Sequence, residues 1–316
     1  MLMGLAMEGY LLYDVGNQTV TLLPFLFDRV SARLGKLDYD AIQFSSSVDK
    51  DKANAVLDLD SATLDIFSVR SVNISDSQRV VVQPLGKYLR MGRNRSFSFS
   101  GDVQVGLFRF KGDSLYFNYD TYSFDLSNLV QVYLQYQTDK YDLEGQRERI
   151  DILSQLSDLK GQVYIDKPDN KSGLRRNPDY PIFESTQRSF VYYDKPSIHR
   201  GVYNRDNFYF EVLPFTFHNL NRFEKKDILF PGKMHASDIF APFDDTLRLR
   251  PDRSLGFIHP TPPAGLPVYQ GKGTFYNSID LSNNGLKGDG ELEYITSRTQ
   301  SNEFYFFPDS TVAVSR

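Results

Sequence analysis

The chain has 316 residues, a formal net charge of −4 and no cysteine. It is long enough for one large or two ordinary domains, and its content of 41% hydrophobic and 24% charged residues is globular. The lack of cysteine excludes disulfides, thiolate metal ligands and cysteine nucleophiles, and no basic stripe points to a nucleic-acid partner. Aromatic residues, 14% of the chain, favour β-structure.

The N-terminal stretch MLMGLAMEGYLLYD is not typical of an export signal. It has no basic segment, and Glu8 interrupts its apolar residues. No run of about 18 apolar residues occurs in the chain, so the sequence predicts no transmembrane helix. In residues 27–37, Val30 and Leu34 are four apart and Gly35 follows, which predicts a short helix.

Period-two alternation dominates the residues that follow and predicts short strands with tight turns. In residues 53–84, apolar residues alternate with polar ones, and Asp, Ser and Asn punctuate them every few positions. Residues 97–126 repeat this pattern. Its phase changes near Gly106, which suggests a bulge or a corner.

The tetrapeptide GDSL at residues 112–115 resembles the signature of the GDSL esterase family, in which the serine is the nucleophile. That chemistry needs the serine on a strand-to-helix turn, whereas the pattern here predicts a strand on both sides. No histidine follows an aspartate by three residues, as the family's Asp-x-x-His requires. We therefore interpret Gly112 and Asp113 as the tip of a hairpin.

A second helix is predicted at residues 144–161, where Ile152, Leu156 and Leu159 stand at i, i+4 and i+7 before Gly161. The expected organisation is a β-repeat region at 1–143, a helical linker at 144–161 and a second β-rich region at 162–316. Strands of the second region are expected at residues 162–167, 189–195, 207–217, 245–251 and 302–314.

Residues 271–294, GKGTFYNSIDLSNNGLKGDGELEY, predict a strand–turn–strand–turn unit, with Asp289 and Glu291 at or beyond a turn. The hexapeptide SIDLSN at 278–283 echoes SFDLSN at 123–128. Repeated strand-and-turn units suggest stacked structure. The predicted fold class is mostly all-β: a β-solenoid, a β-helix or a stacked β-sandwich with one or two short helices.

Residues 189–210, SFVYYDKPSIHRGVYNRDNFYF, hold the richest mixture of aromatic and polar side chains. Aromatic rings can stack on sugar faces while a few polar groups bind hydroxyls. The alternative, which we favour, is a strand core with a polar outer face, because strands need the same aromatics. The candidate glycan-binding residues are Tyr192, Tyr193, His199, Arg200, Tyr203, Arg205 and Tyr209.

Metal and cofactor sites have little support in the sequence. The four histidines stand singly, without zinc-site spacing. Residues 49–60 fail as an EF-hand, because Asn54 and Asp60 occupy positions that require Gly and Glu. Residues 166–173 and 283–291 offer oxygen ligands for calcium, but their Asp, Asn and Gly also favour plain turns. We predict no metal and no cofactor.

Several stretches resemble large, mostly uncharacterised, repetitive β-rich envelope proteins of Bacteroidota-type bacteria. Among them are residues 54–84, 99–120 and 191–215. The segment SNNGLKGDG lies between two predicted strands. It resembles, more weakly, the repeats of OstA-like and AsmA-like lipid-transport proteins, which hold acyl chains in an open β-groove.

The resemblance implies a cell-envelope location, periplasmic or surface-exposed, with an export signal outside this chain and with other segments of a longer polypeptide as partners. If the resemblance to lipid-transport proteins holds, we expect a lipid-binding groove lined by Phe108, Phe110, Leu115 and Phe117.

These observations leave three functional hypotheses. The first is a non-enzymatic structural or scaffold segment of an envelope protein, with the lipid groove as a variant. The alternative is a carbohydrate-binding or adhesin module. The third and least favoured is a polysaccharide-acting enzyme on a β-helix, which needs a pair of acids across a cleft. The acids available for it are Asp206, Glu211, Asp244 and Asp245.

Overall fold

A computed structural model of the chain describes residues 2–36, 42–47 and 52–314. Strands hold 52% of the described residues and helices 8%, which confirms the expected mostly all-β class. The strands form a two-stranded, a 14-stranded and a 10-stranded sheet, and neighbouring strands in them pair antiparallel. A β-solenoid or β-helix is not confirmed.

None of the helices in the described parts of the chain is long and apolar enough to cross a bilayer.

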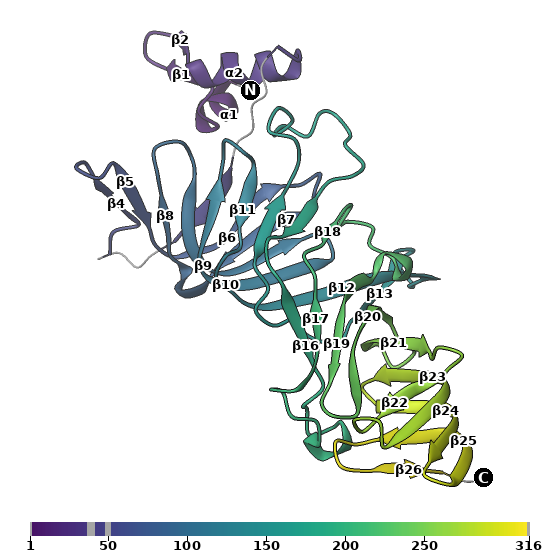
Figure 1. Cartoon of the computed structure of the whole chain (residues 1–316). Coiled ribbons are helices and arrows are strands. Elements are labelled where there is room, and N and C mark those ends of the chain that lie inside the picture. The colour runs from purple at the N-terminus through teal and green to yellow at the C-terminus, as the bar shows by residue number, and fades with distance from the viewer. Residues whose placement is uncertain (1, 37–41, 48–51, 315–316) are drawn as a thin grey trace.

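The N-terminal residues form a small unit of two helices and a hairpin, drawn in purple at the top of Figure 1. Its elements are α1 (Leu2–Met7), β1 (Leu11–Asp14), β2 (Thr19–Leu22) and α2 (Pro24–Arg33). The helix predicted at 27–37 corresponds to α2. It starts earlier, at Pro24, because proline is pre-organised for the first helical turn. Residue 37 lies outside the described residues.

The first large sheet is built around the hairpin of β9 (Phe97–Val105) and β10 (Phe108–Asn118), which turns at Gly106. The phase change predicted near Gly106 is therefore this turn. The other strands of this sheet are β3 (Gln43–Ser46), β4 (Ala55–Asp58), β5 (Thr63–Ile66), β6 (Val69–Ser75), β7 (Val80–Pro84), β8 (Leu89–Met91), β11 (Ser123–Asp125), β12 (Leu129–Tyr141), β13 (Arg147–Asp151), β14 (Gly161–Tyr164), β15 (Ile182–Ser185) and β18 (Thr216–Phe217).

The second large sheet, green to yellow in Figure 1, contains most of the C-terminal half of the chain. Its strands are β16 (Ser189–Tyr192), β17 (Phe208–Val212), β19 (Leu229–Ala236), β20 (Phe240–Leu249), β21 (Leu255–Pro260), β22 (Leu266–Val268), β23 (Gly273–Ser282), β24 (Gly285–Tyr294), β25 (Ser297–Phe306) and β26 (Thr311–Ala313). Three short 3-10 turns complete the described elements: η1 (Leu85–Lys87), η2 (His199–Gly201) and η3 (Lys225–Asp227).

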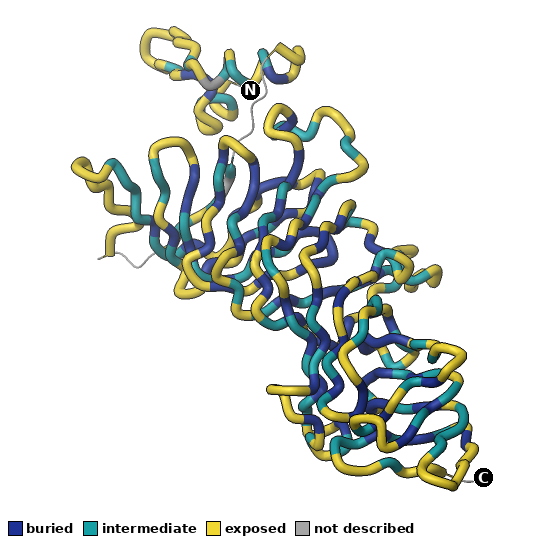
Figure 2. The backbone as a smooth tube through the Cα atoms, in the orientation of Figure 1, coloured by how far each residue is buried: buried dark blue, intermediate teal, exposed yellow. Residues whose placement is uncertain are grey.

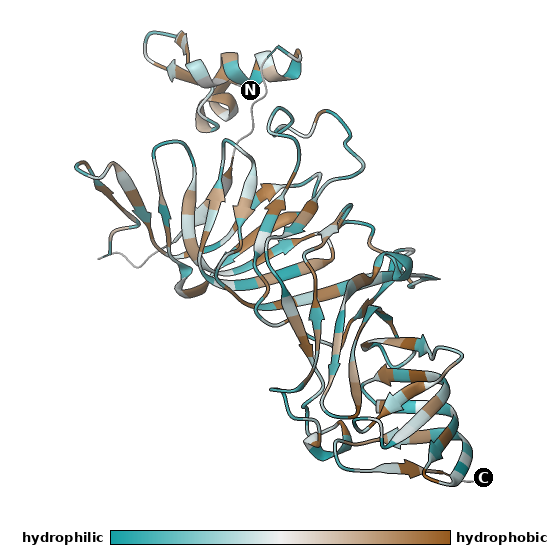
Figure 3. Ribbon diagram, in the orientation of Figure 1, coloured by the Kyte–Doolittle hydropathy of each residue, from teal (hydrophilic) through white to brown (hydrophobic). Residues whose placement is uncertain are grey.

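One hydrophobic cluster runs through both large sheets. It forms because many of their strands bury every second residue; β9, for example, alternates buried and partly exposed positions along its whole length. Figure 2 shows the buried positions inside the sheets and the exposed ones at the loops, and Figure 3 shows apolar residues along the strands. Aromatic rings fill much of the cluster, with Phe108 meeting Phe223 edge to face at 4.9 Å.

The GDSL tetrapeptide lies inside β10 and not at a hairpin tip, so that part of the interpretation is wrong. The strand continues on both sides, as expected, but carries a bulge between Gly112 and Leu115. Within the bulge, the Asp113 N–H donates to the Asn128 carbonyl at 3.0 Å, and Ser114 adopts a φ of 52°. A bulge re-aims a strand without ending it.

The predicted helix at 144–161 is absent from the structure. Residues 147–151 instead form β13, and the chain then runs extended through Ser157, whose backbone exchanges two hydrogen bonds with Phe190. Ile152, Ser154 and Leu156 are all buried, which is strand periodicity. This segment therefore crosses from the first sheet to the edge of the second, and it is not a helical linker.

The chain passes between the two sheets several times after residue 161. β14, β15 and β18 join the first sheet, whereas β16, β17 and β19 join the second. The sheets consequently do not separate at the predicted boundary.

The stretch 271–294 forms one long hairpin, β23–β24, with its turn at Asn283 and Asn284. The predicted second turn is wrong: Asp289 and Glu291 lie inside β24, opposite Ser278 and Tyr276.

Candidate functional site

A patch of aromatic side chains lies on the solvent-facing side of β16, β17 and β19. We call it the aromatic surface; it consists of Phe190, Tyr192, Tyr209 and His235. The strand register aligns it, because Tyr192 is opposite Tyr209 and Tyr209 is opposite His235. Tyr209 stacks on His235 with ring centroids 4.6 Å apart, and meets Phe190 edge to face at 5.7 Å.

Alternation within the strands places these rings outside the core. Val191 and Phe210, the neighbours of surface residues in β16 and β17, are 1% and 0% exposed. Successive side chains of a strand point to opposite faces, so Tyr192 and Tyr209 face away from the core and are partly exposed.

Charged groups border the aromatic surface. The Arg205 guanidinium lies over the Tyr192 ring at 4.2 Å and pairs with Asp194 at 2.9 Å. Glu211 pairs with Arg188 at 2.6 Å and lies 3.4 Å from His235 Nε2. Partial burial raises the pKa of the Tyr192 phenol. The result is a surface of flat rings with hydrogen-bonding groups at its margin, a combination suited to sugar rings.

The seven residues proposed to bind glycan separate into three groups in the structure. Tyr192, Arg205 and Tyr209 meet at the aromatic surface. Tyr193 and Tyr203 are 0% exposed and belong to the core.

The remaining two, His199 and Arg200, lie in η2, a turn that packs against the second sheet through His199. The sequence reasoning missed Phe190 and His235, although alternation places Phe190 on the same face as Tyr192.

Tyr203 and His199 hold the β23–β24 turn. The Tyr203 hydroxyl donates to the Phe306 carbonyl at 2.9 Å and accepts the Leu286 N–H at 3.0 Å. His199 Nε2 lies 2.9 Å from the Asn284 carbonyl oxygen. Burial raises the pKa of Tyr203 to about 12. These two side chains are thus structural anchors for the turn, which explains why they are not at the aromatic surface.

The four residues of the expected lipid groove are core residues. Phe108, Phe110, Leu115 and Phe117 are each 0% exposed. Phe110 stacks on Phe183 with centroids 5.3 Å apart, and Phe117 packs against Phe97 at 5.0 Å. Neighbouring side chains thus fill the space in which an acyl chain would lie.

The four acids of the enzyme hypothesis lie on the surface of the second sheet. Asp206 is exposed in the turn before β17. Glu211 pairs with Arg188, Asp244 lies 3.8 Å from Lys233, and Asp245 contacts His259 Nδ1 at 2.7 Å. Glu211 and Asp244 therefore each have a cationic neighbour that offsets their charge, and Asp245 has the His259 ring as a hydrogen-bonding neighbour.

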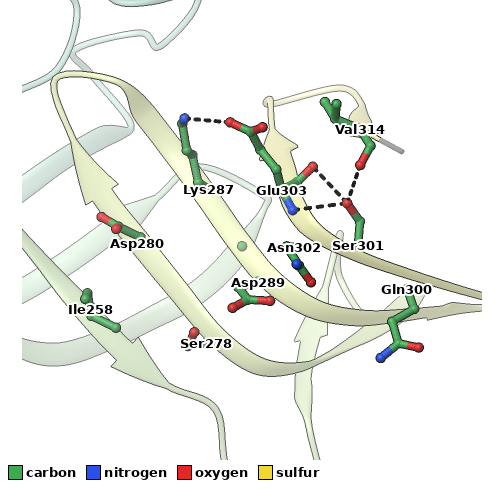
Figure 4. Close-up of a pocket in the computed structure, with 11 residues that line it drawn as sticks. Ile258, Ser278, Asp280, Lys287, Asp289, Gln300, Ser301, Asn302, Glu303 and Val314 are labelled. Atoms are coloured by element: carbon green, nitrogen blue, oxygen red, sulfur yellow. Dashed lines mark hydrogen bonds and ion pairs between the residues drawn. The ribbon is translucent and has the colours of Figure 1, made fainter. Parts of the chain in front are cut away.

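A polar cavity of about 630 Å³ lies on the second sheet, over β23, β24 and β25 (Figure 4). Lys287 bonds to Glu303 at 3.0 Å across it, and the Ser301 hydroxyl donates to the Val314 carbonyl at 2.6 Å. Burial raises the pKa of Asp280 against the opposing effect of Arg250, which pairs with it at 2.6 Å. The stretch 271–294 therefore contributes to a cavity wall as well as to a turn, which its sequence did not indicate.

Comparison of the chain with protein-family models, with curated proteins and with solved structures finds no match.

Proposed function

We propose that this chain is a non-enzymatic structural segment of a bacterial cell-envelope protein. The observation that carries the proposal is the single hydrophobic cluster that extends through both large sheets. A core shared in this way makes two sheets one mechanical body. The envelope location rests on the resemblance of the strand-and-turn phrases. The proposal includes no lipid groove at Phe108, Phe110, Leu115 and Phe117, because those side chains are packed.

The sheets fit a stacked β-structure in which other segments of a longer polypeptide add further strands. β3 ends the ordered path of the first sheet, and β26 ends that of the second. Edge strands present unpaired backbone groups that another strand can bind. The partners proposed for this segment are therefore adjoining parts of the same polypeptide.

Truncation of one core ring in each sheet tests the shared core. Phe117 lies in the first sheet and Phe275 in the second, and both are 0% exposed. If the sheets unfold together, Phe117→Ala and Phe275→Ala will lower the midpoint of the same calorimetric transition. Two main transitions, each sensitive to only one substitution, would refute a single mechanical body.

The location has its own test. In cells that make the full-length protein, an antibody against this chain should detect it in the envelope fraction. Recovery in the soluble cytoplasmic fraction would contradict the proposed location.

A second candidate function is carbohydrate binding, and the aromatic surface is the observation that favours it. Tyr192 and Tyr209 are 6.2 Å apart between ring centroids, and Arg205 and Glu211 border them with hydrogen-bonding groups. Aromatic side chains supply large contact areas with a polar edge. A neutral polysaccharide is the ligand class that fits partly exposed rings and few unpaired charges.

The test is affinity electrophoresis through gels that contain neutral polysaccharides. Tyr192→Ala combined with Tyr209→Ala should weaken retention roughly tenfold, equivalent to about 1.4 kcal/mol. The matched control replaces Tyr116 and Tyr294, which are 40% and 47% exposed at other positions. Equal retention of both double variants, or no retention of the unmodified chain, rules out binding at the aromatic surface.

A further inference from the structure

A second cavity, of about 890 Å³, forms where four segments far apart in the sequence meet. They are the turn between β6 and β7, the β12–β13 hairpin, the loop between β14 and β15, and the loop after β18. Its size lies within the range of small-molecule sites, roughly 300–1,000 Å³. None of its lining residues belongs to the aromatic surface.

The cavity concentrates positive charge in a chain whose formal net charge is −4. Asp166 is the one acid in its lining. The arginines that line it are Arg79, Arg147, Arg149, Arg175, Arg176 and Arg222. A hollow lined by one sign of charge focuses the electrostatic potential and attracts ions of the opposite sign.

Two of these arginines pair with acids. Arg147 pairs with Glu224 at 2.5 Å, and Arg175 pairs with Asp169 at 2.8 Å. Among the residues that the structure describes, the other four make no ion pair, although they come from four different segments. The four are Arg79, Arg149, Arg176 and Arg222.

Asp166 offsets part of this positive charge, but its carboxylate presents no free oxygen to a ligand, because it is 1% exposed and accepts hydrogen bonds from four neighbouring groups. Its carboxylate accepts hydrogen bonds from Gln78 Nε2 at 2.8 Å, from Asn170 Nδ2 at 3.0 Å and from the Lys167 N–H at 2.7 Å. Asn177 Nδ2 adds another at 2.5 Å. This network fixes the loop between β14 and β15 onto the turn between β6 and β7.

The network also fixes the orientation of two amides at the cavity. Because Gln78 Nε2 donates to a carboxylate, the Gln78 Oε1 atom is the acceptor that faces Asn221. Asn221 Nδ2 donates to that oxygen at 2.9 Å. Asn221 Oδ1 is then the atom left over: it is buried and has no hydrogen-bond partner among the described residues. A buried acceptor of this kind calls for an O–H or N–H donor.

We propose that this cavity binds an anionic saccharide, a sugar that carries carboxylate or phosphate groups. The planar guanidinium groups of Arg79, Arg149, Arg176 and Arg222 suit bidentate contacts to such oxyanions. A sugar hydroxyl supplies the donor for Asn221 Oδ1. Tyr141, 68% exposed, adds an aromatic face to the lining.

A nucleic acid fits this site less well. Binding of a phosphodiester backbone uses a basic stripe or groove that follows the strand. Here the unpaired arginines instead surround one hollow.

The experiment is isothermal titration calorimetry on the whole chain at 0.15 M salt. The probes are trigalacturonate for the carboxylate form and glucose 1,6-bisphosphate for the phosphate form. Tricarballylate carries three carboxylates without a sugar ring, maltotriose is a neutral sugar, and a short DNA duplex represents nucleic acid. We expect one of the two anionic sugars to bind at least tenfold more tightly than the other three probes.

Two substitutions locate the binding. Arg79→Gln combined with Arg222→Gln should weaken it roughly a hundredfold, about tenfold for each charge-assisted contact. The matched control, Arg70→Gln combined with Arg93→Gln, removes two exposed arginines outside the cavity and should change little. Asn221→Ala should weaken the binding of the anionic sugar and leave the affinity for tricarballylate unchanged.

Several results would overturn the proposal. They are equal affinity for tricarballylate and the anionic sugars, tightest binding of the duplex, no binding of either anionic sugar, and equal effects of the two arginine pairs. The combined Tyr192→Ala and Tyr209→Ala variant should still bind the anionic probe at full affinity. Failure at the aromatic surface and failure at the arginine-lined cavity are therefore distinguishable.

Discussion

Replacement of Tyr203 by phenylalanine removes one oxygen from the core and tests how the β23–β24 turn is held. The Tyr203 hydroxyl serves two backbone groups, the Phe306 carbonyl at 2.9 Å and the Leu286 N–H at 3.0 Å. The ring stacks on Phe208 with centroids 4.1 Å apart, and phenylalanine keeps that contact. The substitution therefore changes hydrogen bonding while it leaves the packing intact.

The expected loss follows from the two groups left without partners. A buried backbone group that loses its hydrogen bond costs about 1–3 kcal/mol. Tyr203 is 0% exposed, so water does not replace the missing oxygen without rearrangement. With two groups affected, we expect Tyr203→Phe to lower the free energy of unfolding by about 2–4 kcal/mol. That is a large part of the 5–15 kcal/mol typical of a folded domain.

Urea unfolding, followed by circular dichroism, measures this difference. Tyr192→Phe is the control, because it removes the same atom from a partly exposed ring at the aromatic surface. We expect the control to change stability by less than about 0.5 kcal/mol. If Tyr203→Phe costs no more than the control, the hydroxyl does not anchor the turn and the reasoning is refuted.

Three further predictions concern the same core. The pKa of Tyr203 is raised from 10.0 to about 12, so its contribution to stability is complete below pH 10 and is lost as the pH rises to 12. Urea unfolding from pH 9 to 12 should show a fall of about 2–3 kcal/mol that Tyr203→Phe reduces. Phe110→Ala should cost about 3–5 kcal/mol; a loss below about 1 kcal/mol would indicate an open groove instead. Gly285→Ala should cost clearly more than Gly271→Ala in a thermal melt. Both glycines have positive φ, but a Cβ at Gly285 would lie 2.5 Å from His199 Cδ2, whereas nothing lies within 4 Å at Gly271. Equal melting temperatures would contradict this contact.

Alternation within single strands was predictable from the sequence, because the side-chain period of a strand is two wherever one face is buried. The expected faces of β9 and β10 are correct: Phe97 and Phe99 are buried together, as are Phe108 and Phe110. The sequence does not contain the pairing order. Strand β10 pairs with β9 along one edge and with both β11 and β12 along the other. Such branching depends on the bulge at Gly112, which alternation alone does not locate.

The false helix shows how two periodicities can coincide. Ile152 and Leu156 are four apart, which fits one turn of a helix and equally two steps of a strand. Ser154 distinguishes the strand from the helix, because it is buried midway between Ile152 and Leu156. Serine is not hydrophobic, however, so the sequence pattern does not reveal this burial. Leu159 is buried seven positions after Ile152, as a helix would require, because Asp158 adopts a φ of 57° and shifts the alternation of buried and exposed residues by one position. A local reversal of backbone conformation is invisible to a pattern of apolar residues.

The candidate sites were predictable only where they are local. Tyr192 is the last residue of β16 and Tyr193 directly follows it. Because neighbouring side chains of an extended chain point to opposite faces, one of the two must face the core and the other the solvent. The sequence does not say which, because either ring suits either side. The arginine-lined cavity gave no signal at all, since Arg79 and Arg222 are 143 positions apart and meet only through the fold, like Gln78 and Asn221.

The similarity between SFDLSN and SIDLSN reflects the residue types that strands and turns commonly require, more than a repeated structural unit. Both phrases bury their apolar pair, Phe124 and Leu126 in one and Ile279 and Leu281 in the other. Their aspartates differ in role. Asp125 accepts the Ser127 N–H at 2.8 Å and closes a local turn, whereas the equivalent Asp280 pairs with Arg250, which directly follows β20. The first phrase forms a three-residue strand and the second the end of a ten-residue strand. Alternating apolar and polar residues followed by Ser-Asn suit any strand that enters a polar turn. The two hexapeptides can therefore arise independently. A common origin would instead predict matching partners on both sides, and β11 lies between β10 and β14 while β23 lies between β21 and β24.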